Sequence, residues 1–197
     1  LDGAGAPLRR CLDLLALQPK LVAGIDDRRI RSLLSSVGVV GAQLKGMLGF
    51  DAPRSQSPTE RARLREAALA AERLSQVHYF HNEQTEAFSS ALECVQYAEG
   101  IGPSPELARA YAVVGIAVGF VPLPPLVDRY TKRAIEIAEE VDDPHAIGFT
   151  RFLRGLAELN AGRHLSARGH LDSGIEVAAR IGDTRAQQEM LAVVSHV

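Results

Sequence analysis

The chain repeats a short motif at a fixed spacing of 40 residues. Residues 97–102, 137–142 and 177–182 each read as a large apolar or aromatic residue, Ala, two variable residues, a β-branched apolar residue, and then Gly or Asp. A sequence period between about 20 and 50 residues is typical of proteins built from stacked structural units. Each unit in such a protein buries its apolar face against its neighbours, so this period restricts the fold to an array of similar packed units.

Small residues occupy one position of the period four times in succession, at Ser75, Gly115, Gly155 and Ser195. Each lies within a helical pattern of apolar residues. Glycine inside a helix is less favourable than alanine by about 1 kcal/mol, so its presence indicates a packing requirement. We therefore expect a second helix to approach closely at these positions.

The apolar spacing predicts two helices in each unit. In the first unit, the residues with the i, i+3, i+4, i+7 spacing of a helix face are Leu64, Ala67, Ala68, Ala71, Leu74 and Val77, and then Ala87, Ala91, Cys94, Val95 and Ala98. A short turn at His81 and Asn82 makes the two helices antiparallel, as in a hairpin. The following helices are predicted at 105–120, 125–141, 144–160 and 164–181, with a final helix from residue 184.

Capping residues at the ends of these helices support the same boundaries. Ser57, followed by Pro58 and Glu60, predicts a helix start in which the Ser57 hydroxyl and the Glu60 carboxylate bond the first backbone amides. The other predicted caps are Ser104, Asp143 and Asp183 at helix starts, and Gly102 and Gly182 at helix ends. No segment has the pattern of a β-strand, so we expect an all-α protein.

The pattern resembles the tetratricopeptide repeat, which has a small residue on the first helix and alanines on the second. The spacing of Ser75, Ala87 and Cys94 fits it, as does that of Gly155, Ala167 and Gly174. The middle unit departs from it, and the units are longer than the usual length of about 34 residues. The resemblance implies a right-handed superhelical array of antiparallel helix hairpins, an α-solenoid, with about nine helices in the whole chain.

Lengthened units of this kind resemble the helical repeat regions of large bacterial signalling proteins, where they accompany ATPase, nucleotide-cyclase or transcription-regulator modules. The repeats are predicted to span residues 58–197, with units at 58–102, 103–142 and 143–182 and a final helix at 183–197. Residues 1–57 are predicted to form an N-terminal helical segment, which we interpret as a degenerate leading hairpin.

Composition and charge exclude several classes of partner. The net charge of −2 argues against nucleic acid, because binding it requires a concentrated excess of Lys and Arg. The densest basic run is Arg61, Arg63 and Arg65, which we interpret as a solvated helix face rather than a phosphate-binding patch. No apolar run reaches the roughly 18 residues needed to cross a bilayer.

The two cysteines, Cys11 and Cys94, are far apart in the sequence. Cys94 takes the position of the period that Ala134 and Gly174 fill in later units, so we expect a buried thiol rather than a disulfide or a nucleophile. Such a thiol suits a reducing environment, and we expect a cytoplasmic protein.

The only candidate for metal or catalytic chemistry is the group of His78, His81 and Glu83. The two histidines lie one helical turn apart, a spacing that metal sites use. We favour a structural or solvent-exposed role, because such groups arise often without function. Neither a phosphate-binding loop nor a nucleophile elbow is present. We therefore expect no enzyme activity, no metal and no cofactor.

The expected functional surface is a groove formed by the stacking of the repeats, not a cluster of catalytic residues. In repeats of this class the first helices of successive units line a concave groove. The helix positions on either side of the aligned small residue give its predicted lining: Glu72, Gln76, Tyr79, Phe80, Ala112, Ile116, Phe120, Phe149, Phe152, Leu156 and Asn160. This lining is largely apolar, and an exposed apolar concave face is typical of a surface that binds a protein or a small ligand.

The expected function is a protein-interaction scaffold that docks a partner helix, an extended peptide or another copy of itself. The alternative is a regulatory domain that senses a small apolar ligand in the same groove. A third interpretation leaves the groove without a partner, because a tight superhelix or a neighbouring domain buries the same side chains.

Overall fold

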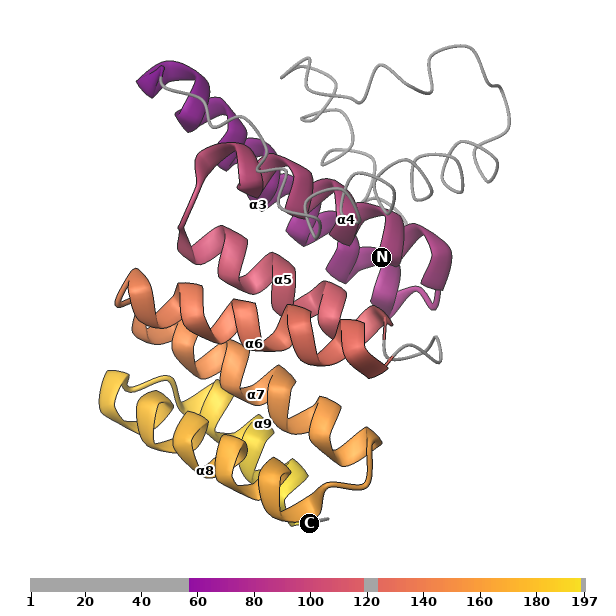
Figure 1. Cartoon of the computed structure of the whole chain (residues 1–197), viewed down its shortest axis with the longest axis vertical. Coiled ribbons are helices and arrows are strands. Elements are labelled where there is room, and N and C mark those ends of the chain that lie inside the picture. Colours follow the sequence, from indigo (N-terminus) through magenta and orange to yellow (C-terminus); the bar gives the residue numbers. More distant parts are fainter. Residues whose placement is uncertain (1–56, 119–123, 196–197) are drawn as a thin grey trace. The chain divides into compact units, whose positions relative to one another are not determined.

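The computed structural model describes residues 57–118 and 124–195, and these residues form helices joined by short turns (Figure 1). The helices are α3 (Pro58–Phe80), α4 (Gln84–Ile101), α5 (Pro105–Val118), α6 (Pro124–Glu140), α7 (Pro144–Asn160), α8 (His164–Ile181) and α9 (Thr184–Val194). These described ranges contain seven helices and no strand, which confirms the predicted all-α class. The predictions for residues 1–56, including Cys11, fall outside them.

The chain divides into two compact units, residues 1–102 and residues 103–197. In the first unit, α3 and α4 pack together as a hairpin. In the second unit each helix from α5 to α9 packs on the next one along the chain, and α7 also contacts α5 and α9. The second unit is therefore a continuous stack in which α7 is the central element.

The predicted helix boundaries agree with the structure to within a residue where both are defined. Helices α7 and α8 begin and end at the predicted residues, and α9 begins at Thr184 as expected. Helix α6 begins and ends one residue earlier than predicted. Helix α5 is described as far as Val118, and its predicted last two residues lie outside the described ranges.

Three of the four predicted helix starts have the expected side-chain cap. Asp143 Oδ1 accepts a hydrogen bond from the Ala146 amide at 2.7 Å, and Asp183 Oδ1 accepts one from the Ala186 amide at 3.0 Å. The Ser104 hydroxyl accepts one from the Leu107 amide at 3.2 Å. The capping prediction is wrong at Ser57, whose side chain makes no cap bond although α3 begins at Pro58. This helix end is exposed to solvent, so water can satisfy its free amides.

The 40-residue period is visible in the backbone as well as in the sequence. Residues with positive φ recur at Gly102 (92°), Asp142 (51°) and Gly182 (72°), after α4, α6 and α8 respectively. The turns after α3 and α7 contain Asn82 (60°) and Gly162 (73°), which are two periods apart. Glycine, asparagine and aspartate are the residues that adopt this conformation at least cost.

Close helix approach explains three of the four aligned small residues. The Ser75 hydroxyl donates to the Ala87 carbonyl oxygen of α4 at 2.8 Å. A Cβ atom on Gly115 would lie 2.6 Å from the Thr131 side chain of α6, and one on Gly155 would lie 2.8 Å from Leu171 of α8. Ser195 differs from the prediction, because it follows the end of α9 and is exposed.

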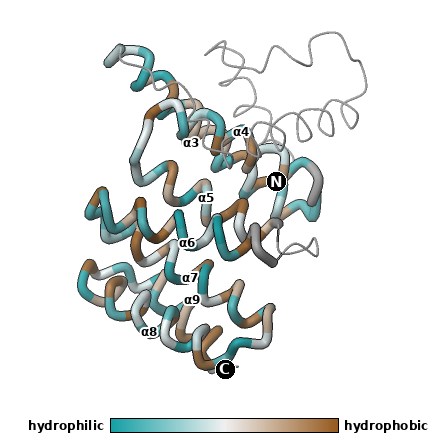
Figure 2. Tube along the Cα trace, in the orientation of Figure 1, coloured by the Kyte–Doolittle hydropathy of each residue, from teal (hydrophilic) through white to brown (hydrophobic). Residues whose placement is uncertain are grey.

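Cys94 is buried as predicted, with 2% of its surface exposed, and its thiol donates to the Ala68 carbonyl oxygen of α3 at 3.2 Å. In the second unit, Leu171, Ala178 and Met190 form a core cluster between α8 and α9. Figure 2 shows hydrophobic and hydrophilic residues mixed along each helix, as expected where only one face of a helix is buried. None of the helices formed by the described residues is long and apolar enough to span a membrane.

Candidate functional site

The predicted groove residues fall into two separate sets. Glu72, Gln76, Tyr79 and Phe80 lie on α3 of the first unit, and Ala112, Ile116, Phe149, Phe152, Leu156 and Asn160 lie on α5 and α7 of the second. Phe120 lies outside the described residues.

The first set ends in two exposed aromatic side chains at the last turn of α3. Tyr79 is 61% exposed and Phe80 is 77% exposed. Their ring centroids are 5.8 Å apart in an edge-to-face arrangement, which is a favourable geometry for an aromatic pair. Glu72 and Gln76 are half-buried, and Gln76 Oε1 accepts a hydrogen bond from Arg73 Nη1 at 3.3 Å.

Most side chains of the second set are less exposed than an open groove would need. Ala112 is fully buried, so it offers no surface to a partner. Phe152 is partly buried against the core cluster of α8 and α9. Ile116, Phe149 and Leu156 are half-buried and only Asn160 is exposed. The reason is the direct packing of α7 on both α5 and α9, which covers part of the face that the sequence assigned to the groove.

The histidine group does not converge on one point. His78 Nδ1 lies 2.5 Å from Glu83 Oε2, so this carboxylate bridges the end of α3 and the turn into α4. Across the described ranges, no group of three or more His, Cys, Asp or Glu side chains has the proximity needed to hold a metal ion. The sequence spacing of His78 and Glu83 thus corresponds to a pair that closes a hairpin turn.

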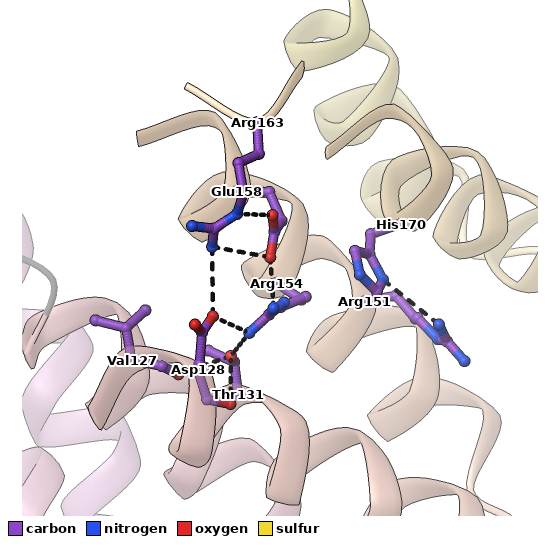
Figure 3. A network of polar contacts seen from close by, with 8 residues as sticks. All are labelled: Val127, Asp128, Thr131, Arg151, Arg154, Glu158, Arg163 and His170. Carbon is purple, nitrogen blue, oxygen red and sulfur yellow. Dashed lines mark hydrogen bonds and ion pairs between the residues drawn. The ribbon is translucent and has the colours of Figure 1, made fainter. Parts of the chain in front are cut away.

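A polar network between α6, α7 and the start of α8 was not predicted from the sequence (Figure 3). Its centre is Glu158 on α7, whose side chain is only 1% exposed. Glu158 Oε1 lies 2.5 Å from Arg154 Nη2 and 3.2 Å from Arg163 Nη2, and Glu158 Oε2 accepts a further bond from Arg163 Nε. We call Arg154, Glu158 and Arg163 the Glu158 triad. One buried carboxylate therefore binds two guanidinium groups.

The triad extends to the preceding helix. Arg154 Nη1 lies 2.9 Å from Asp128 Oδ1 of α6 and donates to the Thr131 hydroxyl at 2.6 Å, while Arg163 Nη2 lies 3.3 Å from Asp128 Oδ1. The Thr131 hydroxyl itself donates to the Val127 carbonyl oxygen at 2.8 Å, which directs its lone pairs toward Arg154. Two residues of α6 thus complete the arginine coordination begun by Glu158.

The charges of the triad reinforce one another. The hydrogen bond from Arg163 is the largest cause that lowers the pKa of Glu158, and it outweighs the opposing effect of burial; the positive charge of Arg154 acts in the same direction. The Glu158 bond in turn raises the pKa of Arg163. A carboxylate held in its charged form by two arginines is a poor general base, so this arrangement is suited to structural cohesion rather than to proton transfer.

A second link joins the other end of α6 to α7. Arg151 Nη2 lies 2.5 Å from Glu139 Oε1, and Arg151 Nη1 lies 3.4 Å from His170 Nδ1 of α8. Burial is the main cause that lowers the pKa of His170, and the neighbouring Arg151 and Arg154 lower it further. A neutral imidazole whose Nδ1 accepts from Arg151 agrees with this shift.

One signal in the sequence points to the network. Arg154 and Glu158 have the i, i+4 spacing of an ion pair along a helix. Their partners Asp128 and Arg163 are 35 residues apart, so only the packed structure brings them together.

No protein-family model matches the chain, and no curated protein matches it either.

Proposed function

We propose that this chain is a protein-interaction scaffold built as a tetratricopeptide-like array, and that it serves as a regulatory or assembly module of a bacterial signalling protein in the cytoplasm. Its partner is a protein or peptide, including another copy of the same chain. The exposed aromatic pair at the end of α3 is the contact point that the proposal assigns to the partner.

Two features support the array. In the second unit each helix packs on the next, and the first helices of successive hairpins, α5, α7 and α9, also contact along the series. Positive φ angles recur at the 40-residue spacing of the sequence motif. Both are expected of hairpins stacked in one direction, in which every unit repeats the contacts of the one before.

The observation that carries the interaction role is the exposure of Tyr79 and Phe80. Burying two such rings in water-excluding contact is favourable by a few kcal/mol in total, since large apolar side chains each contribute about 1.5–3 kcal/mol. Tyrosine is also enriched among the residues that dominate binding energy in protein interfaces. An adjacent pair of exposed rings at a helix end is therefore a suitable anchor for a partner.

A comparative capture experiment tests this role. Wild-type protein and the Phe80→Ala variant are immobilised, incubated with lysate of the source cells, and the retained proteins are quantified. For each protein that wild type enriches, we expect the retained amount to fall at least tenfold with Phe80→Ala. A loss of about 1.4 kcal/mol in binding free energy corresponds to a factor of ten. A purified candidate partner is then titrated to confirm the change in Kd.

Leu165 provides the matched control. It is 93% exposed at the start of α8 in the second unit, and Leu165→Ala removes a comparably exposed apolar side chain away from the aromatic pair. This variant should retain the same proteins as wild type. Equal retention by wild type and Phe80→Ala, with both folded by circular dichroism, would contradict the proposed role of the aromatic pair.

A further inference from the structure

We propose that the contact of Asp128 with Arg154 and Arg163 is a latch, which sets the angle between α6 and the α7–α8 hairpin and opens without unfolding either. The inference is independent of the proposed binding role. It concerns the second unit alone and rests on how charge is distributed between α6 and α7.

Helix α6 is joined to α7 by ionic links near both of its ends. Asp128, near the start of α6, contacts Arg154 of α7, and Glu139, near the end of α6, contacts Arg151, which lies one helical turn earlier on α7 (Figure 3 shows the Asp128 link). The two acidic residues are 11 positions apart, a separation of about 16 Å along a helix. Opening one link while the other holds would let α6 rotate over α7.

The triad stays intact when the Asp128 link opens. Arg154, Glu158 and Arg163 lie on α7 and in the turn that follows it, so the arginines keep their main partner. Asp128 is 50% exposed, so its carboxylate returns to water at small cost. Opening also breaks the hydrogen bond that Arg154 donates to the Thr131 hydroxyl, but Arg154 keeps its contact with Glu158, so no buried charge is left unpaired. Removal of Glu158, in contrast, would leave two arginines facing each other.

The Glu139 link differs from the Asp128 link in its partners. Arg151 contacts Glu139 with one terminal nitrogen and His170 of α8 with the other. Asp128, in contrast, receives both Arg154 and Arg163 on the single atom Oδ1. Loss of that one carboxylate removes two arginine contacts between α6 and the hairpin at once. For this reason we assign the opening motion to the Asp128 end.

The expected size of the motion is measurable. Crossing angles within one packing class differ by about 15° between helix pairs, so both angles are compatible with good packing. A rotation of that size over a lever arm of about 16 Å would move the Asp128 end by about 4 Å. Pulsed electron spin resonance between two nitroxide labels resolves a shift of this size. The 197-residue chain with Cys11→Ser is the background for labelling, and Cys94 remains because it is buried.

Two label pairs separate rotation from general loosening. Lys132→Cys with Leu165→Cys reports on the Asp128 end, and Glu140→Cys with Ala179→Cys reports on the Glu139 end; all four positions are exposed. In the Asp128→Asn variant we expect the first distance distribution to shift or widen by about 4 Å and the second to match wild type. Circular dichroism of each labelled protein checks that the helices are retained.

Asp172→Asn is the matched control, because it makes the same acid-to-amide change in an exposed pair with Arg168 that lies within α8 and links no helices. It should leave both distributions as in wild type. Salt provides a second measurement that needs no change at Asp128. In the labelled protein with Asp128 intact, about 1 M NaCl, where the screening length is about 3 Å, should shift the distribution of the first pair. Glu139 is 49% exposed and is screened as well, so only the Asp128→Asn variant compares the two ends of α6.

Three results would each overturn the latch. The first is an unchanged Lys132–Leu165 distribution in Asp128→Asn, and the second is an equal change in both label pairs. The third is a distribution that does not respond to salt while Asp128 is intact, because a link through a half-exposed carboxylate must be sensitive to screening.

Discussion

Glu158 Oε1 lies 2.5 Å from Arg154 Nη2, one helical turn earlier on α7, although the Glu158 side chain is almost completely buried. A buried carboxylate is stable only when its partners offset the loss of hydration. Here the offset comes from a residue on the same helix, Arg154, and from Arg163 in the next turn. The pair therefore connects the stability of α7 to the hairpin that it forms with α8.

The Glu158→Gln variant should lower the free energy of unfolding of the second unit by about 2–3 kcal/mol, because it removes charge-assisted bonds and leaves two arginines near each other. Urea denaturation followed by circular dichroism measures this loss. Asp172→Asn, which breaks only an exposed pair, should change stability by less than about 1 kcal/mol. Similar losses in the two variants would contradict the central role of Glu158.

The contribution of Glu158 should depend on pH in a defined direction. Its pKa is lowered in the folded protein from the ordinary value of 4.5, so the unfolded chain takes up its proton first as the solution is acidified. The stabilisation is then fully present above the unfolded pKa and is lost as pH falls through the folded pKa. Urea titrations between pH 7 and acid should show the stabilities of wild type and Glu158→Gln converging as the pH falls below 4.5. A constant difference at all pH values would contradict this.

His170 should add a second pH dependence at higher pH. Burial lowers the pKa of His170 from its ordinary value of 6.5, so between the folded and unfolded pKa values the unfolded chain binds more protons. Stability should therefore fall as pH drops below about 6.5, and stop falling once the folded imidazole is also protonated. Thermal denaturation at a series of pH values, with His170→Gln, should show that this part of the slope is absent from the variant.

Two glycine-to-alanine substitutions should change the stability of the protein in opposite directions. A Cβ on Gly155 would lie 2.8 Å from Leu171, so Gly155→Ala should destabilise by about 1–3 kcal/mol through overcrowding. Gly169 is on the exposed face of α8 and has no atom within 4 Å of an added Cβ, so Gly169→Ala should stabilise by about 0.5–1 kcal/mol. Chemical denaturation of both variants tests the pair, and a stabilising Gly155→Ala would contradict the close helix approach.

The helices were predictable because their signals are local. The caps at Asp143 and Asp183 act on amides three residues away, and a glycine such as Gly182 ends its own helix. Apolar spacing then fixes which face is buried. The same local reasoning predicted the buried thiol at Cys94, since its position in the repeat is filled elsewhere by small residues.

The candidate site was less predictable because it depends on distances between elements. Position in the repeat placed Ala112 on an open surface, whereas packing of α5 in the second unit buries it. The contact between Asp128 and Arg163 spans 35 positions and requires α6, α7 and the next turn to be assembled. The cap at Ser57 failed for another reason, since solvent competes with a side chain at an exposed helix end.

The positive-φ residues at Asp142, Gly162 and Gly182 have a mechanical consequence for the second unit. Each lies in a turn that reverses the chain within a few residues, so the turn itself can be extended very little. Under a pulling force, the compliance of this stack must come from sliding of helix faces and exchange of side-chain partners, not from lengthening of these turns. Stiffness would then be set by contacts such as Arg151 with Glu139, which substitutions on helix surfaces can strengthen or weaken without any change in chain length.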